Sequence, residues 1–324
     1  MLLAKIKLIK TNVYKLSQTI LLSLITLGLY SCGSGGTDQS VGRSNSGTGI
    51  ITIGVTDAAV DNATEVWIEF SGVTLKPATG SEINFTFNSV KNIDLLSLQG
   101  ALFTDLIDNE LVETGNYEWM RLHVNAELDG LYDSYIKLDD GSIHELRIPS
   151  GSQTGLKINT SFEVIENQTL NMMIDFDLRK SIIKAGFKYQ MKPVLRLVNV
   201  DNTGHITGSI DGTLLTACEC SDKDPTTGNS VYLFTGHNVI PDDIDNKSPE
   251  PISSALVILN PLSGEYEYAL GYIPFGDYTL AFTCQADQDD PKKNDNIIFS
   301  FIENVTVPVI QPGPPEPPDV PPGR

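Results

Sequence analysis

Carboxylates are the side chains of this sequence whose number and spacing most readily suggest chemistry. Residues 287–296 carry Asp287, Asp289, Asp290 and Asp295. Calcium prefers oxygen ligands of this kind and takes about six to eight of them. A similar acidic loop occurs earlier, at Asp242-Asp243-Ile244-Asp245. Because residues 287–296 lack the glycine and the terminal glutamate of an EF-hand loop, and Lys292-Lys293 opposes a cation, we favour an unoccupied polar loop, with calcium as the alternative.

A second charged group lies in a predicted strand, Leu170-Asn171-Met172-Met173-Ile174-Asp175-Phe176. Side chains two apart on a strand share one face, so Asp175 and Asp177 lie together, with Arg179 next along the same face. The pattern predicts either a site for a small cation or a sugar, or an Asp–Arg network that protects a sheet edge from aggregation. We favour the network.

The remaining catalytic inventory is small. The histidines His123, His144, His205 and His237 are scattered and lack the spacing of zinc ligands. His123 lies in an alternating segment, where a solvated or hydrogen-bonded surface histidine is the favoured interpretation. The sequence contains neither a Gly-x-Ser-x-Gly motif nor a phosphate-binding loop. These observations favour a protein that is not an enzyme and holds no cofactor, calcium excepted.

Aromatic side chains offer a different kind of site, because their faces stack on sugar rings as they do on other apolar surfaces. The candidates are Trp67, Trp119, Tyr132, Tyr135, Tyr266 and Tyr268. Tyr266 and Tyr268 share one strand face, which suits a binding platform and a sandwich core equally well. A glycan therefore remains one possible partner, and the pattern leaves the choice open.

The N-terminal residues predict export. Lysines at positions 5, 7, 10 and 15 precede an apolar segment of about ten residues, 20–29, which is too short to span a bilayer of about 30 Å. Leu29-Tyr30-Ser31-Cys32 resembles the lipobox of bacterial lipoproteins. The resemblance implies cleavage before Cys32, lipidation of its thiol and a membrane partner through the lipid anchor. With Gly33 next and no aspartate there or at Ser34, we expect the outer membrane of a Gram-negative cell envelope.

The charge of the chain excludes other partners. The full sequence has 22 basic and 41 acidic residues, a net charge of −19. Removing the signal peptide removes four lysines and no acidic residue, which leaves 18 basic residues and a net charge of −23. Such a field repels nucleic acid and anionic lipid headgroups, so a nucleic-acid role is excluded.

Three cysteines remain after Cys32: Cys218, Cys220 and Cys284. An exported protein meets an oxidising compartment, and an odd count leaves one thiol unpaired. A bridge between Cys218 and Cys220 would close a strained loop, so we expect Cys284 to pair with one of the two, Cys220 being favoured. A zinc site is not expected, because it needs four ligands at a different spacing.

Most of the remaining sequence alternates with a period of two, which predicts strands separated by short turns such as Asp129-Gly130. We therefore expect an all-β protein with two β-sandwich domains in tandem, prealbumin-like or immunoglobulin-like. Residues 93–111 are expected to form a crossover with one or two helical turns, and residues 297–301 a strand. The expected segments are a signal peptide at 1–31, a flexible tether at 32–49, sandwiches at 50–200 and 204–310, and a proline-rich disordered tail at 311–324.

A short sequence pattern occurs in both halves of the chain. Gly115-Asn116-Tyr117 and Gly276-Asp277-Tyr278 each place Gly-x-Tyr at the start of a predicted strand. The glycine permits a tight turn into the strand, and the tyrosine can bury its ring while its hydroxyl reaches the neighbouring backbone. Prealbumin-like and carboxypeptidase-regulatory-like sandwiches show this pattern, and both halves resemble them.

The first half carries a more specific resemblance. Thr56-Asp57-Ala58-Ala59-Val60-Asp61, Val66-Trp67-Ile68-Glu69-Phe70, Asn92-Ile93-Asp94-Leu95-Leu96, Gly115-Asn116-Tyr117, Ile148-Pro149-Ser150-Gly151 and Ile174-Asp175-Phe176-Asp177-Leu178-Arg179-Lys180-Ser181 occur in this order. Together they resemble the domain-of-unknown-function family 4382 of bacterial lipoproteins over residues 49–199. The second half resembles a carboxypeptidase-regulatory or carbohydrate-binding-like sandwich.

These resemblances imply architecture and location but no chemistry. The favoured hypothesis is a non-enzymatic envelope lipoprotein that serves as a binding or structural module. The alternatives are a carbohydrate-binding surface protein that uses its second sandwich, and an adhesion or assembly scaffold whose partner is another envelope protein. A hydrolase is the least favoured hypothesis.

Overall fold

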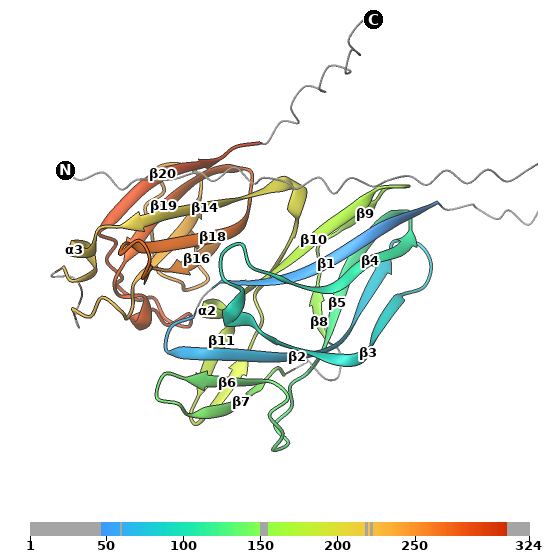
Figure 1. Ribbon diagram of the computed structural model, residues 1–324, viewed down its shortest axis with the longest axis horizontal. Coiled ribbons are helices and arrows are strands. Elements are labelled where there is room, and N and C mark those ends of the chain that lie inside the picture. The colour runs from blue at the N-terminus through green and yellow to red at the C-terminus, as the bar shows by residue number, and fades with distance from the viewer. Residues whose placement is uncertain (1–46, 59, 150–154, 218–219, 221–222, 310–324) are drawn as a thin grey trace, which may run out of the picture.

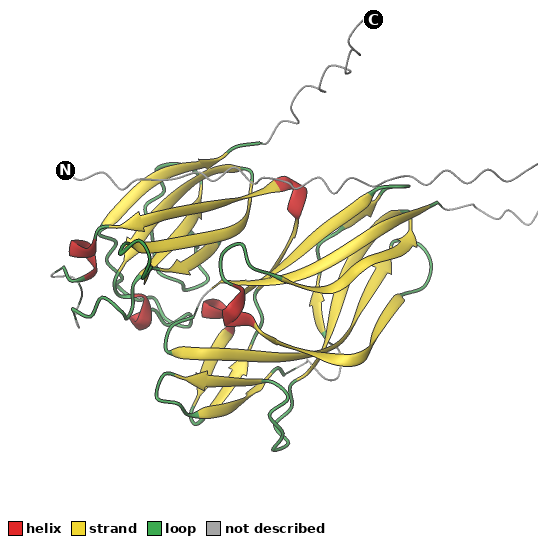
Figure 2. Cartoon of the chain, viewed as in Figure 1, coloured by secondary structure: helices red, strands yellow, loops and turns green. Residues whose placement is uncertain are grey.

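The chain folds into two β-sandwiches that follow one another along the sequence (Figures 1 and 2). The computed structural model describes residues 47–58, 60–149, 155–217, 220 and 223–309. Strands dominate both sandwiches, so the all-β prediction is confirmed. No helix in these residues is long and apolar enough to cross a membrane. The predicted signal peptide, Cys32, the tether up to residue 46, Cys218 and the proline-rich tail lie outside the described residues.

The first sandwich packs a four-stranded sheet against a nine-stranded sheet. In the order β13-β10-β1-β4, the smaller sheet contains β13 (Leu195–Asn199), β10 (Thr169–Asp177), β1 (Thr48–Ala58) and β4 (Thr104–Glu113). The larger sheet has the order β11-β12-β7-β6-β2-β5-β8, with β3 beside β2 and β9 beside β5. Its strands are β2 (Ala63–Pro77), β3 (Ile83–Asp94), β5 (Gly115–Asn125), β6 (Tyr135–Leu138), β7 (Ile143–Arg147), β8 (Leu156–Ile158), β9 (Phe162–Val164), β11 (Ile182–Ala185) and β12 (Lys188–Met191).

Alternation along the strands creates the first core. Every second residue of β1 and of the first half of β2 is fully buried, and these residues are Ile51, Ile53, Val55, Val66, Ile68 and Phe70. The ring of Phe70 meets that of Phe176 on β10 edge to face, with centroids 6.1 Å apart. Burying each such side chain contributes about 1.5–3 kcal/mol. The intervening residues of β2 point outward, which leaves one face of the larger sheet for solvent or for a ligand.

The predicted crossover at residues 93–111 is only partly helical. A 3-10 turn, η1 (Leu95–Leu98), follows β3, and β4 begins at Thr104. β4 buries Leu106, Ile107 and Val112, exposes residues 108–111, and pairs with β1. Gly100, at φ +69°, ends the turn region, and the chain then continues as a strand.

The second sandwich is smaller. One sheet has the order β14-β18-β17 and contains β14 (Thr203–Ile210), β18 (Tyr266–Pro274) and β17 (Ile258–Leu259). The other has the order β16-β15-β19-β20 and contains β16 (Ser253–Leu256), β15 (Ser230–Thr235), β19 (Gly276–Thr283) and β20 (Phe301–Val307). Short helical turns are η2 (Val200–Asn202), which joins the sandwiches, α3 (Gly212–Leu215) and η3 (Ala286–Gln288). The two main cores draw on residues 51–197 and 206–307.

The strand predicted at residues 297–301 is wrong. β20 starts only at Phe301, where it joins β19. Before that point the backbone N–H of Ile298 donates to the side-chain oxygen of Gln285, at 2.8 Å. A side chain therefore satisfies a backbone group that a strand partner would otherwise take.

The two Gly-x-Tyr segments adopt the same local structure. Tyr117 is buried at the start of β5 and its hydroxyl donates to the carbonyl oxygen of Glu113, at 2.8 Å. Tyr278 is buried at the start of β19 and its hydroxyl donates to the carbonyl oxygen of Pro274, also at 2.8 Å. In both cases the acceptor lies four residues before the tyrosine, on the other side of the turn. Each sandwich thus closes one corner with the interaction that the sequence predicts.

The outer face of the four-stranded sheet packs against the second sandwich. Met173 of β10 and Val198 of β13 bury their side chains against Tyr272 of β18. The Tyr272 hydroxyl donates to the carbonyl oxygen of Ala101, at 3.1 Å. Close approach is possible here because residue 271 is glycine, and any Cβ at that position would collide with the backbone of Gly100. The sandwiches therefore share an apolar contact.

Candidate functional site

Asp175, Asp177 and Arg179 do not form the single-faced strand cluster that the sequence predicts. β10 ends at Asp177, and Arg179 lies in a one-turn helix, α2 (Leu178–Ser181). β10 lies between β13 and β1, so it is not an edge strand, and all three side chains are buried. The prediction of a shared face that includes Arg179 is wrong because Asp177 starts a helix, accepting a hydrogen bond from the N–H of Lys180 at 3.1 Å.

Arg179 instead projects from α2 and contacts residues of the second sandwich. Figure 1 shows α2 where the two sandwiches meet. The Arg179 guanidinium donates to Ser230 Oγ at 2.7 Å, to Tyr232 Oη at 3.3 Å and to the carbonyl oxygen of Ala286 at 3.0 Å. Asp61, in the turn before β2, neutralises it at 2.5 Å. A permanently charged group is thus buried with one partner from its own sandwich and three from the other.

The neighbouring charges of α2 and β10 are paired in different ways. Lys180 donates to the carbonyl oxygen of Pro251 and lies 3.4 Å from both Asp177 and Glu250. Asp175 accepts from Arg196, at 2.6 Å. Burial raises the pKa of Asp175 above its ordinary value, although Arg196 beside it acts in the opposite direction. These pairs support a structural role at the interface.

Asp57, at the end of β1, is the least compensated acid of the first sandwich. It is buried, and neither of its carboxylate oxygens makes a hydrogen bond of normal geometry. Burial raises its pKa well above the ordinary value, and Asp175, Asp177 and Asp94 raise it further. The folded protein therefore holds the Asp57 proton to a higher pH than the unfolded chain does. The sequence analysis included Asp57 in the segment 56–61 that resembles the family, but it assigned this residue no role.

The structure divides the four carboxylates predicted for calcium. Asp289 and Asp295 come together with Asp243 of the earlier acidic loop, and one ligand oxygen from each lies within 4.8 Å of the others. Asp290 instead pairs with Lys293 at 2.6 Å, and Asp287 lies exposed in η3. In the described part of the chain, this is the one group of three or more acidic, histidine or cysteine side chains with a metal-binding arrangement.

The histidines take part in local contacts. His123 Nε2 lies 2.7 Å from Thr74 Oγ1, so it is a hydrogen-bonded residue on a sheet face. Its pKa is lowered by burial and by the neighbouring Arg121. His205 packs its ring against Tyr272, and His144 packs against Tyr189.

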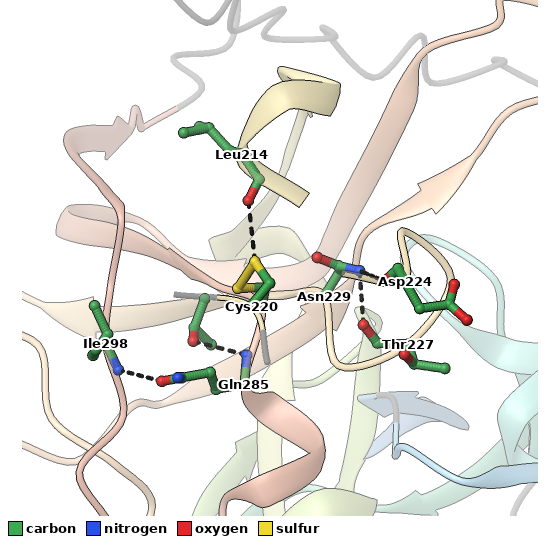
Figure 3. The surroundings of a disulfide bond; sticks show 9 residues. Leu214, Cys220, Asp224, Thr227, Asn229, Gln285 and Ile298 are labelled. Atoms are coloured by element: carbon green, nitrogen blue, oxygen red, sulfur yellow. Dashed lines mark hydrogen bonds between the residues drawn. A yellow bond between two sulfur atoms is a disulfide. The ribbon is translucent and has the colours of Figure 1, made fainter. Parts of the chain in front are cut away.

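The disulfide bond joins Cys220 to Cys284, the pair that the sequence analysis favoured, across 64 residues of sequence (Figure 3). Cys220 follows α3, and Cys284 follows β19. Around the bond, the side-chain amide of Asn229 donates to the carbonyl oxygens of Asp224 and Thr227, as Figure 3 shows. The bond and this loop fasten the start of the second sandwich to β19.

Three of the six candidate aromatic side chains form a group on the outward face of the larger sheet. Trp67 of β2 and Tyr135 of β6 are register partners, with nearly parallel rings whose centroids lie 6.2 Å apart. Tyr132 stands almost perpendicular to Tyr135, with centroids 6.3 Å apart, and is 57% exposed. We call Trp67, Tyr132 and Tyr135 the aromatic platform. It combines two rings supported by strands with a third ring presented by a loop.

Carboxylates border the aromatic platform. In register across the sheet, Asp94 lies on one side of Trp67, and Glu145 lies on the far side of Tyr135. Glu65 accepts from the indole N–H of Trp67 at 2.8 Å and from Lys137 at 2.6 Å, and these bonds lower its pKa. The platform therefore offers apolar ring faces beside hydrogen-bond acceptors, which is the composition of a surface that binds polar, ring-shaped molecules.

The other candidate aromatic residues have different surroundings. Trp119 lies on the same sheet between two cations, Arg121 at 4.7 Å and Lys157 at 4.6 Å from its ring centroid. Tyr268 is buried in the core of the second sandwich, and Tyr266 packs against that core. Of the two alternatives for this tyrosine pair, the structure gives the core. The exposed aromatic group thus belongs to the first sandwich, whereas the sequence analysis placed a sugar site in the second.

A groove of about 810 Å³ lies between the sandwiches, with residues 96–102 on one wall and β14, β16, β17 and β18 on the other. Its rim exposes Leu102, Ile258 and Leu259, which are 60%, 59% and 52% exposed. The lining also contains polar side chains, among them Gln99, Asn260 and Glu267, so the groove combines an apolar rim with hydrogen-bonding groups.

The sequence did not reveal which distant residues contact Arg179, the acidic loops and the aromatic platform. Asp61, Ser230 and Tyr232 surround Arg179 but come from distant segments, and no local motif connects them. Asp243 was visible as part of a second acidic loop, and its approach to Asp289 depends on how the two loops fold. Strand register was the missing information for the aromatic platform.

The comparison with known families identifies one part of the chain. Residues 48–193 match the family described as Domain of unknown function (DUF4382). This confirms the resemblance of the first half to that family. The match ends just before β13, the last strand of the first sandwich. No curated protein and no solved structure matches the chain.

Proposed function

We propose that this protein is a non-enzymatic, lipid-anchored module of the bacterial cell envelope that binds glycans through the aromatic platform of its first sandwich. The observation that carries the proposal is the arrangement of Trp67, Tyr132 and Tyr135. Two of the rings lie nearly parallel on adjacent strands, and the third stands upright beside them with 57% exposure.

The chemistry of the platform fits a sugar. A pyranose ring has one apolar face of C–H groups, which gains favourable contact on an aromatic ring, and a rim of hydroxyl groups that need hydrogen-bond acceptors. Asp94 and Glu145 lie on either side of the ring pair in the register of the sheet. Each accepts one backbone N–H, from Val66 and Gly130 respectively, and a carboxylate has further lone pairs that can accept from a sugar hydroxyl. Because the platform lies on an open sheet face, it suits a chain of sugars better than an isolated small molecule.

The anchor supports a function at a surface. Lipidation at Cys32 would hold the folded part of the chain near a membrane, while residues 33–46, rich in glycine and serine, would provide reach. The net charge of −23 left after signal cleavage would keep the sandwiches away from anionic headgroups and available for a ligand. Replacing Cys32→Ser should abolish labelling by a fatty-acid analogue and move the protein out of the membrane fraction; continued labelling of the variant would contradict the anchor.

A glycan array probed with the full chain tests the binding function. Binding should concentrate on one class of glycan, and Tyr132→Ala should weaken it at least tenfold, about 1.4 kcal/mol, because this ring is the most exposed of the three. Tyr266→Ala is not a suitable control, because that ring packs on the second core. Absence of binding to every glycan would contradict the proposal.

The groove between the sandwiches favours a second candidate function, assembly with another envelope protein. The exposed side chains of Leu102, Ile258 and Leu259 form an apolar rim, and β17 is an edge strand that can accept a further strand. A photocrosslinking residue at position 259 should then capture one discrete partner in cells, and Ile258→Asp should abolish capture. Crosslinking that is diffuse, or unchanged by Ile258→Asp, would remove this candidate.

A further inference from the structure

Two acidic loops of the second sandwich are fastened together by hydrogen bonds. The backbone N–H of Ile244 donates to both oxygens of Asp289, at 3.2 Å, and the N–H of Asp295 donates to Asp243 Oδ2. The side-chain amide of Asn294 donates to Asp245 at 3.1 Å. These bonds hold the carboxylates in place by backbone contacts, so the arrangement does not depend on chance orientation of surface side chains.

The distances within the group fit one cation. One oxygen each from Asp243, Asp289 and Asp295 lies within 4.8 Å of the others. Calcium binds oxygen at about 2.3–2.6 Å, so two ligands on opposite sides of the ion are about 5 Å apart. One oxygen from each of the three carboxylates would provide three of the about six to eight donors that calcium takes, and water would complete the set.

A separate observation shows that one oxygen of the group lacks a partner. Asp243 is only 1% exposed, and its Oδ1 is buried with no hydrogen-bond partner. An acceptor in this position costs free energy unless a proton or a cation meets it. The three lysines of these loops do not serve. Lys247 pairs with Asp245 and Lys293 pairs with Asp290, with both side chains 68% exposed, and Lys292 is exposed as well.

The donor set selects the kind of ion. All three candidate ligands are carboxylates, and neither histidine nor cysteine belongs to the group, which disfavours zinc. Calcium tolerates irregular geometry and loop-borne ligands, whereas magnesium demands a near-ideal octahedron and keeps most of its water.

Asp289 also connects the group to the other sandwich. Its Oδ2 accepts from the Tyr232 hydroxyl at 2.7 Å, and that hydroxyl accepts from Arg179 of α2 at 3.3 Å. Arg179 in turn pairs with Asp61. One buried chain of polar contacts therefore runs from the acidic group of the second sandwich to the first sandwich.

We propose that Asp243, Asp289 and Asp295 bind one calcium ion, and that Asp289 communicates its occupancy through Tyr232 to Arg179, so that calcium tightens the docking of the two sandwiches. The ion fixes the Asp289 carboxylate, which orients the Tyr232 hydroxyl toward the guanidinium. Calcium then acts on α2 without contacting it.

Calorimetric titration of the full chain with CaCl₂, after treatment with a chelator, tests the site. One ion should bind per chain, with MgCl₂ at least tenfold weaker. Asp243→Asn and Asp289→Asn should each weaken the affinity for calcium at least tenfold. Asp290→Asn changes a residue near Asp289 that pairs with Lys293, and it should leave the affinity within twofold of the wild type. Asp295→Asn changes a half-buried side chain of the same group. This variant tests the site where Asp243→Asn or Asp289→Asn does not fold. Terbium luminescence excited through tyrosine should appear in the wild type and be lost in Tyr232→Phe.

Hydrogen exchange at α2 tests the coupling. Calcium should slow exchange of the amides at residues 178–181 at least threefold in the wild type, and Tyr232→Phe should bind calcium yet lose this protection. No calcium binding at 5 mM, or equal affinity in the wild type, Asp243→Asn and Asp289→Asn, would overturn the site. Equal protection of α2 in the wild type and Tyr232→Phe would overturn the coupling.

Discussion

The two sandwiches solve the same folding problem at different sizes. The first packs four strands against nine. Its described residues, which lie between 47 and 199, include no cysteine, so its core holds it together without a disulfide bond. The second packs three strands against four and adds the Cys220–Cys284 bond. A smaller sheet pair buries less apolar surface per residue, so a covalent connection compensates. The comparison indicates that the second sandwich depends on its crosslink and on the interface more than the first does.

The sandwiches also present their polar groups differently. The first carries its aromatic platform mainly on strands, where register fixes the rings, whereas the second carries its acidic group on two loops. Arg179 joins the two sandwiches through Ser230 and Asp61. These placements are the basis of the two proposals, a preformed glycan-binding surface on the first sandwich and a calcium site on the second.

Arg179→Met should give the largest effect on stability. It leaves Asp61 without its partner and Ser230 and the Ala286 carbonyl without a donor, and removing one member of a buried ion pair costs about 3–5 kcal/mol. Urea denaturation should show both sandwiches destabilised. Lys137→Met, which breaks a partly exposed pair with Glu65, should cost less than about 1 kcal/mol. Equal effects of the two variants would mean that the sandwiches are independent.

Cys284→Ser should follow in size and act on one sandwich. In the chain-entropy model, a loop of 64 residues corresponds to roughly 4 kcal/mol, less any strain in the native state. Thermal unfolding should show the second sandwich melting earlier and the first nearly unchanged, and peptide mapping without reductant should find the Cys220–Cys284 bond. A loss of stability confined to residues 49–199 would reverse the comparison.

Asp57→Asn should change how the first sandwich responds to pH. The folded-state pKa of Asp57 lies well above that of the unfolded chain, because the carboxyl is buried and faces Asp175, Asp177 and Asp94, with the Leu178 N–H acting weakly in the other direction. The folded protein therefore holds the proton more tightly, and the free energy of unfolding falls as the pH rises from about 4 through the folded-state pKa.

The Asp57→Asn variant lacks this titration, so its stability should decline less than that of the wild type over the same pH range. Urea denaturation at a series of pH values, with the exposed-site variant Asp140→Asn as control, measures the difference. Parallel pH profiles for the wild type and Asp57→Asn would show that the carboxyl is solvated.

Tyr117→Phe and Tyr278→Phe should give the smallest effects, and equal ones. Each removes one hydroxyl that donates to a backbone carbonyl at 2.8 Å, which costs about 1 kcal/mol. Chemical denaturation of the two variants compares the corners directly. If only one of the two variants lowered the free energy of unfolding, the two Gly-x-Tyr segments would not be structurally equivalent.

Local pattern predicted the features that local physics controls. Alternation gave the strands of β1, β2, β5 and β10, and the two Gly-x-Tyr segments gave both corners. The Cys220–Cys284 pairing could be favoured because a bridge between neighbouring cysteines is strained. In each case the contacts that determine the structure join residues close in sequence, or only a few partners are available.

Local pattern failed where long-range contacts decide. Arg179 reads as a strand residue, but the cap at Asp177 and the docking of α2 on the second sandwich make it helical and buried. Residues 297–300 read as strand, but the Gln285 side chain takes the backbone group of Ile298. The aromatic platform required the register of β2 with β6, which one sequence does not reveal.

The most direct test of the proposed function compares two tryptophans on one sheet by calorimetry with the glycan that the array selects. Trp67→Ala removes the centre of the aromatic platform and should weaken binding at least tenfold. Trp119→Ala removes a ring of the same size that lies between Arg121 and Lys157, away from the platform, and should leave the affinity within twofold. Equal loss in both variants, or full affinity in Trp67→Ala, would contradict the account.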